Sequence, residues 1–144
     1  MFTNARMLIK TSLIFFIVGM LAGLPLLGQR FFGWAVPYGV QAAHVHLLLI
    51  GGMVMMILGV AIWFFPRPPA GDKKYNPTII LILYYALTLA TILRFPLEAH
   101  SILPWILFTA SLVQILSIIG IVYSIWGRIR AVGSQIREKK GERF

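Results

Sequence analysis

Three histidines are the residues of this chain with the most scope for chemistry. An imidazole can ligate a metal ion, carry a proton or hold a cofactor, and it is costly in a membrane unless it has such a task. His44 and His46 open a run of nineteen apolar or glycine residues without a charge, and His100 follows a later apolar run. At 1.5 Å per residue, nineteen residues cross a hydrocarbon core of about 30 Å. The sequence therefore predicts a membrane helix that begins with two buried imidazoles.

The spacing of His44 and His46 limits how the pair can act. Residues two apart on an α-helix point about 200° from each other, so the two rings cannot both bind one metal ion. We expect one ring to face the bundle interior and the other to face a neighbouring subunit, the interface or water. His44 shares its helix face with Gly51 and Gly59, where a flat ring or another helix can come close. This stripe favours His44 as the residue that faces a cofactor.

Four apolar runs must position these residues. The 144 residues are 59% hydrophobic and 12% charged, and the mean hydropathy is +0.85, which excludes a soluble domain of this size. The runs cover about residues 8–27, 41–65, 77–93 and 102–126, and a basic tail follows over 128–144. Asn76 with Pro77, and Ser101 with Pro104, are predicted to begin the third and fourth helices. We expect one all-α domain over residues 1–144, an integral membrane four-helix bundle.

The basic residues orient the predicted bundle. With the N-terminus in the cytoplasm, eleven of the thirteen Lys and Arg residues fall on the cytoplasmic side, and only Arg30 and Arg94 fall outside. This bias predicts two cytoplasmic termini in a multi-pass protein of a prokaryotic inner membrane. The net charge of +9 is explained by this orientation. We expect the basic tail to contact anionic lipid headgroups, and we expect no nucleic-acid partner.

The same topology gathers polar side chains at one depth near the outer face. They are His44, His46, His100, Arg30, Arg94, Glu98 and Tyr38. The chain has no cysteine, which excludes thiolate ligands, iron–sulfur clusters and covalent haem attachment. The sequence shows no carboxylate pair, nucleophile–base set or phosphate-binding glycine loop, so we predict no catalytic residue.

Three further patterns are interpreted as helix packing. Gly19 and Gly23 form a GxxxG motif, a notch that lets another helix approach closely. Two polar stripes are expected to hydrogen-bond between helices. They comprise Tyr84, Thr88 and Thr91 in the third run, and Ser111, Gln114, Ser117 and Ser124 in the fourth.

The segment AHVHLLLIGGMVMMILGVAIWFFPR, residues 43–67, resembles the second transmembrane helix of the haem–copper oxidase and nitric oxide reductase superfamily. The similarity is greatest to small subunit-I-like proteins, whose pattern is H-x-H-L-x-L-x-G, then a glycine and a terminal aromatic-x-x-P. That pattern is filled here by His44, His46, Leu47, Leu49, Gly51, Gly59, Trp63 and Pro66. The preceding segment TSLIFFIVGMLAGL resembles the first helix of the same superfamily.

The resemblance implies a non-covalent haem b near the outer face, with His44 or His46 as an axial ligand and Arg94 or Arg30 paired with the propionates. A second axial ligand would come from His100 or from a histidine of another copy across a two-fold dimer. The superfamily's enzymes use six histidines on twelve or more helices, so this chain is not expected to form their reducing centre alone. The resemblance thus implies a small b-type cytochrome that transfers electrons or binds a diatomic gas.

Two alternatives stay open at this point. His44, His46 and His100 at an outer surface also suit copper or zinc without a porphyrin. Alternatively, the chain is a non-catalytic accessory subunit of a larger respiratory assembly, and its histidines only reach towards the membrane interface.

Overall fold

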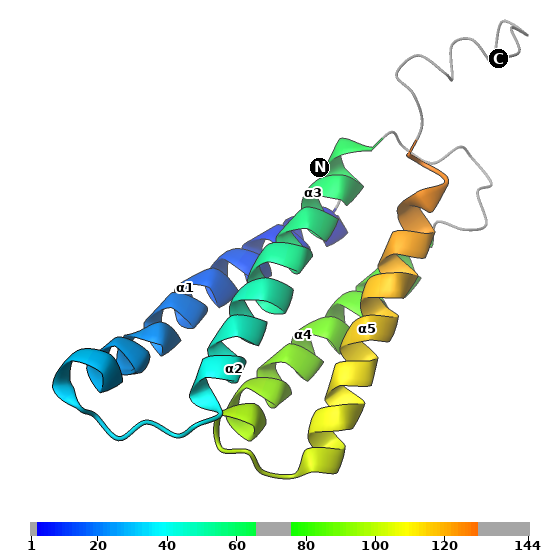
Figure 1. The fold of residues 1–144 in the computed structure, drawn as a ribbon. Coiled ribbons are helices and arrows are strands. Elements are labelled where there is room, and N and C mark those ends of the chain that lie inside the picture. The colour runs from blue at the N-terminus through cyan, green and yellow to red at the C-terminus, as the bar shows by residue number, and fades with distance from the viewer. Residues whose placement is uncertain (1–2, 66–75, 130–144) are drawn as a thin grey trace, which may run out of the picture.

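The computed structural model describes residues 3–65 and 76–129, which form four long helical rods (Figure 1). The elements in chain order are α1 (Thr3–Phe32), α2 (Val40–His46), η1 (Leu47–Val54), α3 (Met55–Phe64), α4 (Pro77–Ala99) and α5 (Pro104–Trp126). The second rod, Val40–Phe64, combines α2, η1 and α3. All four rods are long and apolar enough to cross a membrane, and the described residues contain no strand. The predicted all-α architecture with four membrane-length helices is confirmed.

Two helices extend beyond the predicted apolar runs. The first begins at Thr3 and ends at Phe32, five residues outside the expected limits at each end. The third rod continues to Ala99, so Arg94 and Glu98 lie in the last turns of α4. The tail beyond residue 129 and the basic residues of the second connection, between 66 and 75, lie outside the described residues.

The two predicted helix starts have different outcomes. Asn76 caps α4 as predicted, because its side chain accepts a hydrogen bond from the Thr78 amide at 2.9 Å, and Pro77 occupies the first position. The prediction that Ser101 caps α5 is wrong. Pro104 is already the first residue of α5, so the N-cap position falls on Leu103, which has a left-handed φ of 52° and no side-chain capping bond.

A π-helical segment interrupts the second rod. This segment, η1, begins at the residue after His46. It contains Gly51 and Gly52, and both face α1: a Cβ on Gly51 would lie 2.8 Å from the Phe15 ring, and one on Gly52 2.9 Å from the Phe16 ring. The glycines therefore let the widened turns of η1 pack closely against α1. Short π-helical stretches are frequent at functional sites.

The helices pack in neighbouring pairs around an apolar core. The first helix runs along the second rod, α2 contacts α4, and α4 packs along α5, whereas no Cα atoms of the described parts of α1 and α5 come within 8 Å of each other. Small residues at heptad spacing, Ala110, Ser117 and Ser124, are buried on α5 and permit its close approach to α4. The largest fully buried apolar side chains are Leu8, Met55, Ile62, Ile80, Leu87 and Ile121.

The four rods alternate in direction, so the bundle has two distinct ends (Figure 1). At one end, the Asn4 side chain donates to the carbonyl oxygen of Pro77 at 2.8 Å, and Arg128 donates to that of Phe65 at 2.8 Å. The start of α1, the end of α3, the start of α4 and the end of α5 therefore meet there. The opposite end, here called the loop end, contains the turns after α1 and α4 and the histidines.

Candidate functional site

The loop end carries the seven polar side chains that the sequence predicts near the outer face. His44 and His46 come from α2, and Arg94 and Glu98 come from the last turns of α4; all four are partly buried. The remaining three, Arg30, Tyr38 and His100, are exposed. All seven therefore lie at the loop end, but only four of the seven side chains lie between helices.

His44 is held against α1. Its Nδ1 lies 2.8 Å from the carbonyl oxygen of Gly19, so Nδ1 carries the proton and donates it to that carbonyl. The edge of the ring lies over Gly23, where a Cβ would be 2.8 Å from Cε1. The GxxxG motif is thus a packing notch, as predicted, and the group that fills it at Gly23 is the imidazole. With Nδ1 occupied, the neutral ring has its lone pair on Nε2.

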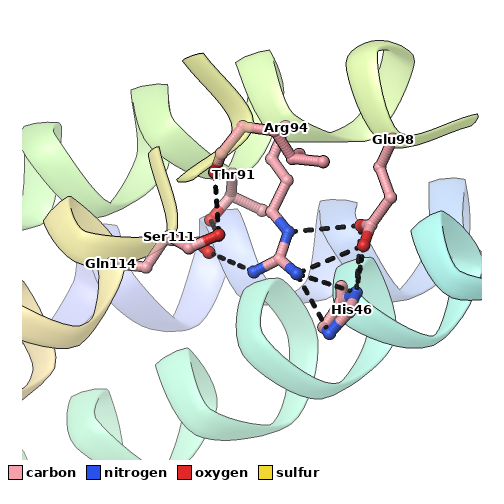
Figure 2. Close-up of polar contacts among 7 residues, drawn as sticks. His46, Thr91, Arg94, Glu98, Ser111 and Gln114 are labelled. Atoms are coloured by element: carbon pink, nitrogen blue, oxygen red, sulfur yellow. Dashed lines mark hydrogen bonds and ion pairs between the residues drawn. The ribbon is translucent and has the colours of Figure 1, made fainter. Parts of the chain in front are cut away.

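His46, Arg94 and Glu98 form a charged cluster between α2 and α4 (Figure 2). His46 donates from Nδ1 to the Glu98 carboxylate at 2.9 Å, and Arg94 donates to the same carboxylate from Nε and Nη2, both at 3.2 Å. The Nη2 group of Arg94 also lies 3.1 Å from both ring nitrogens of His46. The side chains are 35% exposed for His46 and only 13% and 12% for Arg94 and Glu98. This low exposure makes the pairing of charges essential.

The side-chain amide of Gln114 extends the cluster onto α5, and the hydroxyl of Thr91 bonds to that amide (Figure 2). Arg94 Nη1 donates to Gln114 Oε1 at 2.9 Å, and Gln114 Nε2 donates to Thr91 Oγ1 at 3.0 Å. Thr91 in turn donates to the carbonyl oxygen of Leu87 at 2.7 Å. Gln114 and Thr91 are buried. The predicted interhelical bonding of the two polar stripes is confirmed in part. Gln114 bonds to Thr91 and Tyr84 bonds to Thr11 across helices, whereas Ser111 and Ser124 donate to carbonyl oxygens of their own helix.

The two imidazoles of α2 point in different directions, as expected, but both face helices of the same chain. His44 contacts α1 and His46 contacts α4, so both rings are bound inside the same chain. The reason is that the loop end of the second rod lies between α1 and α4, which offers each side of α2 a helix. Arg94, one of the two guanidinium groups expected to pair with propionates, is instead occupied by Glu98, Gln114 and His46. Its spacing of four residues from Glu98 on one helix is the sequence signal for that pairing.

Metal ligation by three side chains finds no support in the described residues. Across residues 3–65 and 76–129, no group of three His, Cys, Asp or Glu side chains lies close enough to hold a metal ion. His100 is exposed beyond the end of α4, while His44 and His46 face different helices. The structure thus does not bring the three imidazoles into one site.

The Gly39→Ala substitution is expected to weaken the contact between α2 and α4. A Cβ at position 39 would collide with the carbonyl oxygen of Glu98 and lie 2.9 Å from that of Ala99. The φ of −71° itself suits alanine, so the variant tests the contact alone. We expect a lower thermal unfolding midpoint in detergent, whereas Gly127→Ala should behave like the unsubstituted protein because a Cβ there meets nothing within 4 Å. Equal midpoints for the two variants would contradict the close packing.

Comparison with known proteins assigns no family to this chain. No family model, curated protein or solved structure matches the chain. The likeness of residues 43–67 to an oxidase helix therefore stays a prediction. The function is best argued from what His44, His46 and their neighbours can do chemically.

Proposed function

We propose that this chain is a multi-pass membrane protein that holds haem b non-covalently, with Nε2 of His44 as an axial ligand. The hydrogen bond from His44 Nδ1 to the Gly19 carbonyl is the observation that supports this assignment. Metal-bound histidines almost always donate their other ring N–H to a carbonyl, carboxylate or water, which fixes the tautomer and the ring orientation. His44 has this arrangement, and its ring lies on the side of α2 that faces the glycine notch of α1.

His46 and His100 are less suited to bind the iron. Nδ1 of His46 is bound to Glu98, and Nη2 of Arg94 lies 3.1 Å from both ring nitrogens, so iron at Nε2 would lie beside a fixed guanidinium. A cation beside Nε2 also disfavours a metal ion there. His100 is exposed after the last residue of α4. Among the three imidazoles, His44 has the donor chemistry that fits.

Haem supplies one-electron redox chemistry, or binds a diatomic gas where an axial position is open. The chain's own contribution is to hold the ligand nitrogen and to neutralise the propionates. Because Arg94 is committed to Glu98 and Gln114, we assign the propionate role to Arg30. Arg30 is exposed and lies seven residues after Gly23 on α1. At 1.5 Å per residue, the two positions are about 10 Å apart along the helix axis.

The number of haems per chain distinguishes the two modes of use. One haem per two chains would be held by His44 of each copy and would supply electron transfer in a homodimer. One haem per chain would be held by a single His44 and would supply binding of a diatomic gas. Because His46 and His100 do not share the environment of His44, a second protein ligand is best supplied by another copy or by a larger respiratory assembly.

The proposed orientation places His44 towards the outer face of a prokaryotic plasma membrane, with both termini in the cytoplasm. Basic residues support it, because Arg6, Lys10 and Arg128 lie at the end of the bundle opposite the histidines. Bulky apolar side chains cover the outward faces of all four rods, which is compatible with lipid contact.

The direct test is the visible spectrum of the purified full-length protein. We expect a Soret band that shifts on reduction, and a pyridine haemochrome assay that gives haem b at one per chain or one per two chains. The absence of a Soret band, even after haem is added to detergent-solubilised protein, would refute the haem proposal. The accessory-subunit alternative would then be the better account.

A further inference from the structure

The Thr88 hydroxyl is the described polar group whose placement is hardest to explain by helix packing. It lies on α4, its Oγ1 is buried, and it has no hydrogen-bond partner within the described residues. Other hydroxyls within the membrane-length helices donate to the carbonyl oxygen one turn earlier on their own helix. They are those of Thr91, Ser111 and Ser124. Thr88 does not donate to the Tyr84 carbonyl in this way.

A buried hydroxyl without a partner destabilises a fold, and native structures rarely retain one. In the rotamer that Thr91 uses, the Thr88 hydroxyl would donate to the Tyr84 carbonyl. The observed placement therefore indicates a partner outside the polypeptide. It also leaves the second lone pair of the Tyr84 carbonyl available.

Thr88 lies between two hydrogen-bonded groups on one face of α4. One turn towards the α4 N-terminus, the Tyr84 hydroxyl is 2.7 Å from Thr11 Oγ1 of α1. One turn in the other direction, Thr91 accepts from Gln114, which leads to Arg94. The steps from residue 84 to 88 and from 88 to 91 correspond to axial rises of about 6 and 4.5 Å. Thr88 is therefore one turn from each hydrogen-bonded pair along the helix.

We propose that Thr88 binds an internal water molecule in the middle of the membrane. The water has the two or more polar partners that buried waters need: the Thr88 hydroxyl and the unused lone pair of the Tyr84 carbonyl. The site lies on the face of α4 that also carries the Thr11–Tyr84 and Gln114–Thr91 bonds, one turn away on either side. This site does not depend on haem and stands if the haem proposal fails.

Water contact can be tested on the full-length chain in nanodiscs with isotope-labelled threonine methyl groups. We expect nuclear Overhauser cross-relaxation between water and the Thr88 methyl, with the sign of a long-lived bound water. The Thr109 methyl is the control, because Thr109 is exposed and its hydroxyl is satisfied by Ile106 at 2.9 Å. A Thr88 methyl with no water contact would overturn the proposal.

Two substitutions give an independent readout in which the two interpretations predict opposite signs. If Thr88 holds a water, Thr88→Val should lower the thermal unfolding midpoint and Thr88→Ser should restore it. If the hydroxyl has no partner, Thr88→Val removes an unsatisfied group and should raise the midpoint. Thr109→Val serves as the matched control for a hydroxyl bonded to its own helix. A midpoint for Thr88→Val equal to or above that of the unsubstituted protein would refute the water site.

Discussion

Removing one partner of the Arg94–Glu98 pair is expected to destabilise the protein by about 3–5 kcal/mol, whereas removing both is expected to cost much less. Each side chain is almost nine-tenths buried, and the two contacts between them are 3.2 Å long. Glu98→Leu leaves a guanidinium in an apolar bundle with only Gln114 and His46 as partners. Arg94→Met leaves a carboxylate with only His46. An uncompensated charge in such surroundings is the costly species.

The measurement is a double-mutant cycle in detergent, with Glu98→Leu, Arg94→Met and the double variant compared by denaturant unfolding. We expect a coupling free energy of several kcal/mol, because the double variant contains no unpaired charge. Arg6→Met is the control for loss of a positive charge at an exposed site. Additive effects of the two substitutions would show that the pair makes no net interaction.

The same cycle bears on how the helices are held together. Arg94 and Glu98 belong to α4, but their cluster also binds His46 of α2 and Gln114 of α5. Loss of one charge is therefore expected to loosen three helices at the loop end, not one ion pair on one helix. Hydrogen exchange at the amides around His46 should rise in Glu98→Leu.

The four rods could be predicted because lipid imposes a simple rule. Only a helix of about twenty apolar residues satisfies its own backbone in hydrocarbon, so hydropathy alone locates each rod. The alternating direction of the four helices then predicts that these polar side chains lie at the same end of the bundle. The pairing of Arg94 with Glu98 follows from their spacing on one helix. Their contact with His46 depends on which helices are neighbours, and composition does not encode that.

The local departures have tertiary causes that a sequence pattern does not reveal. The π-helical turns of η1 are built from apolar residues that would suit an α-helix equally well. Close packing of Gly51 and Gly52 on the phenylalanines of α1 distinguishes this segment. Likewise, the start of α5 is set by a tight turn with two left-handed residues, Ser101 and Leu103, and not by a capping side chain.

Haem binding is expected to be lost in His44→Ala and retained in His46→Ala. In the proposed site only Nε2 of His44 is available to the iron, since Nδ1 is bound to Gly19. His46 serves the cluster with Arg94 and Glu98, so its removal should lower the unfolding midpoint without abolishing the Soret band. Comparing the two variants therefore distinguishes His44, the proposed ligand, from His46, a structural histidine two residues later on the same helix.

The readout is the haem-to-protein ratio of each purified variant, with His100→Ala as the control for an exposed imidazole. A His44→Gly protein supplied with free imidazole should recover the Soret band, because the small ligand replaces the missing ring; recovery shows that the bundle is folded. The opposite pattern, with haem retained in His44→Ala and lost in His46→Ala, would assign the ligand to His46. Coordination by His46 would require Arg94 to leave its ring, so the proposed division between a ligand facing α1 and a charge cluster facing α4 would be wrong.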